Sequence, residues 1–176
     1  MFDSIHEECG VFGIYDAAGE QDVVLSTYLA LYALQHRGQE SCGIAVCDGG
    51  VITHHKDLGL VSDVFPREVL DSLGQGQMAM GHVRYSTTGT RSRANAQPLV
   101  INHIKGTMSL AHNGNLTNAA ELREELELGG AIFHATSDTE VIAYTITRER
   151  INSASIEEAL ERAMNKIRGA YSLVIM

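Results

Sequence analysis

The chain has 176 residues, of which 44% are hydrophobic and 20% are charged, a composition typical of one globular domain with an ordinary apolar core. Its formal net charge of -9 at pH 7 would repel phosphate backbones, and no local cluster of lysine and arginine offsets that charge, which argues against nucleic acid as a partner. The longest apolar stretch, residues 23–34, is far shorter than the roughly 20 residues that a membrane span needs, so we expect no membrane insertion.

The N-terminus and the cysteines indicate a reducing compartment. Residues 1–8 lack the basic and apolar regions of a secretory signal, so we expect a cytoplasmic protein. Cys9, Cys42 and Cys47 cannot pair completely and show no Cys-x-x-Cys spacing, which favours reduced thiols, the last two in the core. His54 and His55 are neighbours on a predicted strand and should point to opposite faces, so we expect no metal site there.

Short apolar segments, punctuated by glycine and other turn residues, predict β-strands. They are residues 9–15, 41–47, 51–55, 78–85, 99–103 and 107–112. Asp48-Gly49-Gly50 should join the second and third strands as a hairpin, and the turn around Gly106 should join the last two. Residues 91–97 read as a polar loop ahead of the fifth strand.

One helix is predicted in the first half of the chain, and three in the second. Asp22 can cap a helix that runs to Gln35, and because this helix is apolar nearly all round we expect it to be covered on more than one side. Another helix should begin near residue 117 or 118 and end at Gly129-Gly130, with the acidic run at 121–127 facing solvent. Two Ser-x-x-Glu capping boxes mark the remaining helix starts: Ser137 with Glu140, and Ser155 with Glu158.

The order of elements, with strands first and helices later, predicts a layered α+β fold with mostly antiparallel connections. Residues 170–176 form an apolar strand pattern that no turn or polar tail follows. We therefore expect the domain to be truncated at its C-terminal end.

Four segments hold the candidate chemistry. They are Cys9-Gly10-Val11-Phe12-Gly13, His36-Arg37-Gly38-Gln39-Glu40-Ser41, residues 81–89 (GHVRYSTTG), and His112-Asn113-Gly114-Asn115 with Ser137-Asp138-Thr139-Glu140 downstream. Each alone has a purely structural explanation: Cys9 as a small buried residue, Arg84 in an exposed ion pair, Asn113-Gly114 as a hairpin turn, and Asp138 as a helix-start carboxylate.

Together, these segments resemble the class II glutamine amidotransferases of the N-terminal-nucleophile hydrolase superfamily, over essentially the whole chain. Within that class, HRGQES, GHVRYSTTG and HNGN are similar to the amidophosphoribosyltransferase family. The alternative, a glucosamine-6-phosphate synthase-like domain, would carry a tryptophan after Arg84, and this chain has no tryptophan. The resemblance implies an αββα sandwich, in which two mostly antiparallel sheets lie between helical layers.

Hydrolysis of a carboxamide needs a strong nucleophile, a base and donors for the developing oxyanion. An N-terminal cysteine supplies the first two, because its α-amine has a pKa of about 7.7 to 8.0 and can take the thiol proton. Cys9 gains a free amine only if the bond before it is cut. We therefore expect residues 1–8 to be a leader and residues 9–176 to be an incomplete amidotransferase domain.

The resemblance implies roles for the other candidate residues. Arg84 would bind the α-carboxylate of glutamine and Asp138 its α-ammonium, while the side chain of Asn113 and the backbone N–H of Gly114 would hold the oxyanion. Residues 85–95 would form a loop that closes over glutamine. Tyr85 would couple the site to a second domain, and Arg37 and Gly38 would shape the pocket floor.

The family enzyme passes the ammonia to phosphoribosyl pyrophosphate and makes 5-phosphoribosylamine, in the first step of de novo purine synthesis. That step belongs to a C-terminal phosphoribosyltransferase domain, whose motifs this chain lacks, so we expect at most the glutaminase half-reaction here. The resemblance implies Mg²⁺ in that absent domain, in some members a [4Fe–4S] cluster with ligands beyond residue 176, and a homo-oligomer, a tetramer, at full length. We expect no cofactor in this chain itself. A catalytically silent glutamine-binding module is the second alternative.

Overall fold

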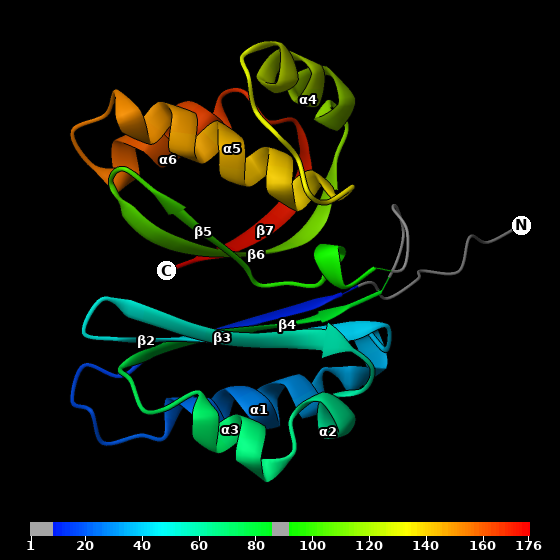
Figure 1. Cartoon of the computed structure of the whole chain (residues 1–176), viewed down its shortest axis with the longest axis vertical. Helices are drawn as coiled ribbons and strands as arrows, with labels where there is room; N and C mark the ends of the chain where they lie inside the picture. The colour runs from blue at the N-terminus through cyan, green and yellow to red at the C-terminus, as the bar shows by residue number, and fades with distance from the viewer. Residues whose placement is uncertain (1–8, 86–91) are drawn as a thin grey trace, which may run out of the picture.

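The computed structural model describes residues 9–85 and 92–176; the expected leader and residues 86–91 of the expected closing loop lie outside the described residues. Two antiparallel sheets face each other between two layers of helices (Figure 1). The layered α+β architecture predicted from the sequence is therefore confirmed. No helix in the described ranges is long and apolar enough to cross a membrane.

The first sheet has the strand order β1-β4-β2-β3, and every neighbouring pair is antiparallel. Its strands are β1 (Gly10–Tyr15), β2 (Ser41–Asp48), β3 (Val51–Leu58) and β4 (Met78–Arg84). The helices on its outer face are α1 (Val23–Ala33), α2 (Val61–Val64) and α3 (Arg67–Ser72), and a single 3-10 turn, η1 (Gln35–Arg37), follows α1 (Figure 1). The hairpin at Asp48-Gly49-Gly50 is confirmed. Helices α2 and α3 are not predicted by the sequence pattern, because helices this short carry too little periodicity to be recognised.

The second sheet has the order β5-β6-β7, again antiparallel, with helices on its outer face (Figure 1). Its strands are β5 (Leu99–His103), β6 (Gly106–Leu116) and β7 (Gly169–Ile175), and its helices are α4 (Ala119–Leu128), α5 (Asp138–Ile151) and α6 (Ile156–Met164). A 3-10 turn, η2 (Arg93–Asn95), precedes β5. The predicted strand at 170–176 thus finds its partner in β6.

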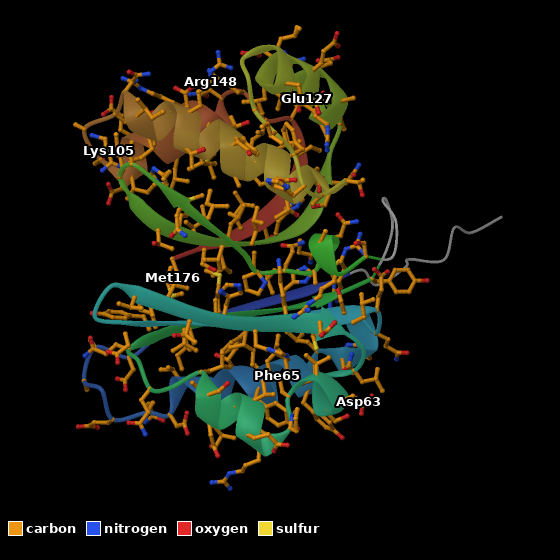
Figure 2. All side chains as sticks on the ribbon, in the orientation of Figure 1. Asp63, Phe65, Lys105, Glu127, Arg148 and Met176 are labelled. Atoms are coloured by element: carbon orange, nitrogen blue, oxygen red, sulfur yellow. The ribbon has the colours of Figure 1, made fainter. Side chains whose placement is uncertain are left out.

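Apolar side chains fill three layers. The first sheet packs on its helices through residues such as Leu31 and Ile44, and Phe65 points into this layer from the end of α2 (Figure 2). The second sheet packs on its helices through Leu110 and Ile142. The layer between the sheets is built around Ala45, Met80 and Ala111, and Met176 packs at its margin (Figure 2). Burial of these three layers supplies the main driving force for the fold.

Helix ends and surfaces depart from the predictions in two places. At Ser155 the hydroxyl accepts the N–H of Glu158 as predicted, while the Glu158 carboxylate accepts the N–H of Ala154; Ser137 makes no side-chain cap at α5. The carboxylate of Glu140 instead accepts the N–H groups of His134 and Ala135, in the turn before the helix. Helix α1 packs on the first sheet and also against α2, as expected, but its outward side chains Leu25, Leu29 and Tyr32 are exposed.

Candidate active site

Cys9 lies at the start of β1, against the end of β4. Its Sγ is 3.4 Å from both the backbone N and the backbone O of Tyr85, and Arg37 Nε donates to the Cys9 carbonyl at 2.7 Å. The φ angle of Cys9 is +50°, in the left-handed region that a residue with a side chain seldom adopts. Strain of this kind persists only where surrounding contacts enforce it, and it is concentrated at functional sites.

Gly38 lies directly beneath the same end of β4. A Cβ at this position would be 2.7 Å from the backbone N and C of Arg84, a separation that real Cβ atoms do not tolerate. Glycine therefore lets η1 approach the strand that carries Arg84. The structure thus brings Arg37, Gly38, Arg84 and Cys9 close together.

Arg84 is buried and forms an ion pair with Glu40. The alternative that Arg84 only takes part in an exposed ion pair is therefore wrong. The guanidinium Nη1 donates to a carboxylate oxygen of Glu40, and the backbone N–H of Glu40 donates to the carbonyl of Arg84 at 3.1 Å. Sequence reasoning passed over Glu40 although it lies within the HRGQES segment. The signal available was physical, since a buried arginine needs a counter-charge nearby.

Asn113 and Gly114 do not form a hairpin turn. Strand β6 runs on through both residues, which pair with Ser172 and Tyr171 of β7. Gly114 has φ +144°, and a Cβ there would be 2.2 Å from the carbonyl O of Ala170. Only glycine fits where β7 approaches so closely.

The side chain of Asn113 faces the first sheet. Its neighbour His112 faces α5, because its Nδ1 lies 3.4 Å from Asp138 Oδ1 and 3.4 Å from Thr139 Oγ1, and successive strand residues point to opposite faces. The carbonyl of His112 accepts a hydrogen bond from His82 Nε2 at 3.0 Å, which joins β6 to β4 two residues before Arg84. Asn113 therefore lies at the end of the inter-sheet layer that also holds Arg84.

Asp138 is the first residue of α5, and it is bonded to the end of β6. Its Oδ2 accepts the backbone N–H of Leu116 at 2.9 Å. Burial by itself raises the pKa of this carboxyl, but the hydrogen bonds and charge of His112 and the N–H of Leu116 outweigh burial, and the pKa is lowered overall. Asp138 therefore carries its negative charge at neutral pH.

Two buried polar residues of this region were not singled out from the sequence. Burial lowers the pKa of His82 to about 3, so its ring is neutral, and Nε2 carries the proton because it bonds to a carbonyl oxygen. Gln97, in the stretch read as a polar loop, is also buried and bonds to the backbone of His112. Residues 92–97 form a connection between β4 and β5, as predicted, but Asn95 is buried like Gln97 and is bonded to Thr136.

The three cysteines differ in accessibility. Cys9 is partly exposed, whereas Cys42 and Cys47 are buried, as predicted for core thiols. Burial, together with the charges of two aspartates, raises the pKa of Cys42 to about 12, which suppresses its thiolate. Tyr85 follows β4 and is 52% exposed, beside the Cys9 thiol. Cys9 is thus the accessible thiol of the described region.

Two facing antiparallel sheets between helical layers, with an accessible thiol at the head of the first strand, form the architecture of the N-terminal-nucleophile hydrolases. Residues 82–176 match the family described as "Glutamine amidotransferase domain". The chain belongs to this family.

The two curated relatives compared next are both amidophosphoribosyltransferases. The chain is 48% identical over 168 residues to the amidophosphoribosyltransferase of Methanocaldococcus jannaschii, covering 96% of this chain and 35% of the relative. It is 49% identical over 173 residues to that of Synechococcus elongatus, covering 98% of this chain and 34% of the relative. The chain thus spans about a third of the length of the relatives it matches.

Solved structures agree with the fold. The glutamine phosphoribosylpyrophosphate amidotransferase from B. subtilis, complexed with ADP and GMP, superposes with a TM-score of 0.79 at 40% identity, over 96% of this chain and 34% of that chain. A second structure, described as the allosteric regulatory enzyme of purine biosynthesis, superposes with a TM-score of 0.84 at 41% identity, over 94% of this chain and 35% of that chain.

Proposed function

We propose that this chain is the glutamine-hydrolysing part of an amidophosphoribosyltransferase, with Cys9 as its nucleophile once residues 1–8 are removed. The observation that carries the proposal is the position of the Cys9 thiol, 3.4 Å from the backbone of Tyr85, the residue that follows the buried Arg84. A reactive sulfur and a cation suited to an amino-acid carboxylate thus occupy one end of the sandwich.

The reaction follows from these groups. The α-amine of a mature Cys9 takes the thiol proton, and the thiolate adds to the side-chain carbonyl carbon of glutamine. The oxyanion is held by the side-chain NH₂ of Asn113 and the backbone N–H of Gly114. Collapse breaks the C–N bond, the protonated amine returns its proton to the leaving nitrogen, and ammonia departs. Water then cleaves the γ-glutamyl thioester, which releases glutamate and the free thiol.

Arg84 and Asp138 would select glutamine by the two charged groups of its amino-acid end. The planar guanidinium of Arg84 matches the α-carboxylate of glutamine, and its ion pair with Glu40 keeps it oriented before substrate arrives. Asp138 matches the α-ammonium, since its lowered pKa keeps it ionised. Arg37 and Gly38 would hold the floor under Cys9 and Arg84, and Tyr85 would couple the site to the second domain.

The names of the relatives support a role in a longer enzyme. There, ammonia from this domain would convert phosphoribosyl pyrophosphate to 5-phosphoribosylamine in a second domain, in a cytoplasmic homo-oligomer. Mg²⁺ and any [4Fe–4S] cluster would belong to that second domain. Among the described residues no group of three or more His, Cys, Asp and Glu side chains could hold a metal ion.

The experiment compares glutamate release by the chain produced to begin at Cys9, by the chain that retains residues 1–8, and by Cys9→Ala. We expect activity only in the first, because the second lacks the free amine and the third lacks the sulfur. Cys47→Ala is the matched control, as this thiol is buried in the core, and it should retain activity. Equal glutamate release by Cys9→Ala and its parent contradicts the proposal, and glutamine binding without any glutamate favours the silent binding module.

A further inference from the structure

We infer that Gln97 is a positioning residue for the oxyanion donors, and that it acts through the backbone of His112. The inference rests on the proposed function, because it concerns how Asn113 and Gly114 are held for that reaction. It begins from the pairing between β5 and β6, which places Leu99 opposite Leu110 and Val100 opposite Ser109.

Just before β5 begins, the side chain of Gln97 replaces the backbone of a strand as the hydrogen-bonding partner of β6. Continuing the register by two residues places position 97 opposite His112, but β5 starts at Leu99. Gln97 Oε1 accepts the N–H of His112 at 2.7 Å, and Gln97 Nε2 donates to the carbonyl of His112 at 3.2 Å. The side-chain amide thus makes both hydrogen bonds that a neighbouring strand would make.

These two hydrogen bonds determine the orientation of the peptide unit between His112 and Asn113. The carbonyl of His112 belongs to the planar peptide unit that ends at the N–H of Asn113, so the direction of one determines the direction of the other. This carbonyl accepts from two donors, Gln97 Nε2 and His82 Nε2. Gln97 and His82 are both buried, as is His112, so water cannot readily replace either bond. The peptide that precedes the proposed donors is therefore held from two sides.

Gln97 is itself held against the first sheet. A Cβ on Gly43 of β2 would be 2.2 Å from the Gln97 carbonyl, so only glycine allows this segment to cross so close to the sheet. Lys56 Nζ also donates to the carbonyl of Ala96 at 2.6 Å. The sheet that presents Cys9 and Arg84 thereby sets the position of Gln97, and Gln97 sets the strand that presents the oxyanion donors.

The test measures glutamine hydrolysis by Gln97→Met and Gln97→Glu in the chain that begins at Cys9, beside Gln75→Met as an exposed control. A misplacement of about 1 Å at a reacting centre can cost about 100-fold, so we expect kcat to fall about 10- to 100-fold in both variants. KM for glutamine should stay within about twofold, and so should the rate of Cys9 alkylation by iodoacetamide, since neither needs an oxyanion.

A general loosening of the fold would change all three quantities together, so parallel losses in kcat, KM and alkylation overturn the inference, as does an unchanged kcat. If Gln97→Met fails to fold, the isosteric Gln97→Glu decides, because its carboxylate still accepts the N–H of His112 but cannot donate to the carbonyl.

If the parent hydrolyses no glutamine, the proposed function fails and the positioning is decided by NMR of asparagine-labelled protein. The side-chain amide signal of Asn113 should then shift in the Gln97→Glu variant, while that of exposed Asn165 stays in place. An unmoved Asn113 signal overturns the inference.

Discussion

Replacing Gly114 with alanine tests how closely β6 and β7 approach beside the proposed oxyanion donors. The added Cβ would be 2.2 Å from the Ala170 carbonyl O and 2.6 Å from Tyr171 Cα, so one strand must move by about 1 Å to reach ordinary contact. The φ of +144° adds strain of about 1 to 3 kcal/mol for a residue with a side chain. Each ladder hydrogen bond lost in the shift costs about 1 kcal/mol more.

The matched control is Gly106→Ala, at the other end of the same strand. Gly106 has φ +127°, but a Cβ there would meet nothing within 4 Å, so this variant isolates backbone strain from crowding. We expect Gly114→Ala to lose about 2 to 5 kcal/mol of unfolding free energy and Gly106→Ala about 1 to 3 kcal/mol. For a domain of this size each kcal/mol lowers Tm by roughly 2 to 4 °C.

Thermal and urea unfolding of the two variants and their parent provide the assay. A loss in Gly114→Ala no larger than in Gly106→Ala would refute the close approach of β7, since strain alone would then account for both. Gly114→Ala should also lower kcat for glutamine, because any strand shift moves the backbone donor that the proposed reaction uses.

Three further predictions concern charged groups. Arg84→Lys should raise KM for glutamine about 10- to 100-fold, since losing one charge-assisted hydrogen bond costs about 1.5 to 3 kcal/mol; an unchanged KM contradicts the role of Arg84. Because the pKa of Asp138 is lowered in the folded state, its contribution to stability is present above its ordinary value of 3.8 and is lost at lower pH. Urea unfolding of Asp138→Asn should therefore show less acid-induced destabilisation than that of the parent. Burial and the charge of Arg93 lower the pKa of Lys56 to about 8, whereas the unfolded chain keeps the proton until about pH 10.5. The free energy of unfolding should therefore rise between those two pH values because of this group. The Lys56→Met variant should lack that rise, and an equal rise in both proteins contradicts the prediction.

Features decided by nearby residues could be predicted from the sequence. The Asp48-Gly49-Gly50 hairpin and the Asp22 cap of α1 depend on residues a few positions apart, and both form as expected. The cap of α5 was mispredicted because the carboxylate of Glu140 has a competing set of backbone donors, whose position depends on how the chain enters the helix.

Long-range pairing decided the rest of the site. Asn113-Gly114 has the local preference of a turn, yet it continues a strand because β7, more than fifty residues later, supplies the hydrogen bonds that a turn would forgo. The ion-pair partner of Arg84 and the hydrogen bonds of Gln97 could not be predicted either, since Glu40 lies 44 positions before Arg84 and Gln97 lies 15 before His112.

The sequence by itself therefore determined which residues are proposed to carry the chemistry, because residue type and order suffice to recognise a thiol, a cation and a carboxamide in a family pattern. Only the tertiary structure decided how they are held. Ion pairs, strand register and close backbone approaches depend on segments that are far apart in the chain and meet only when the sheets pack.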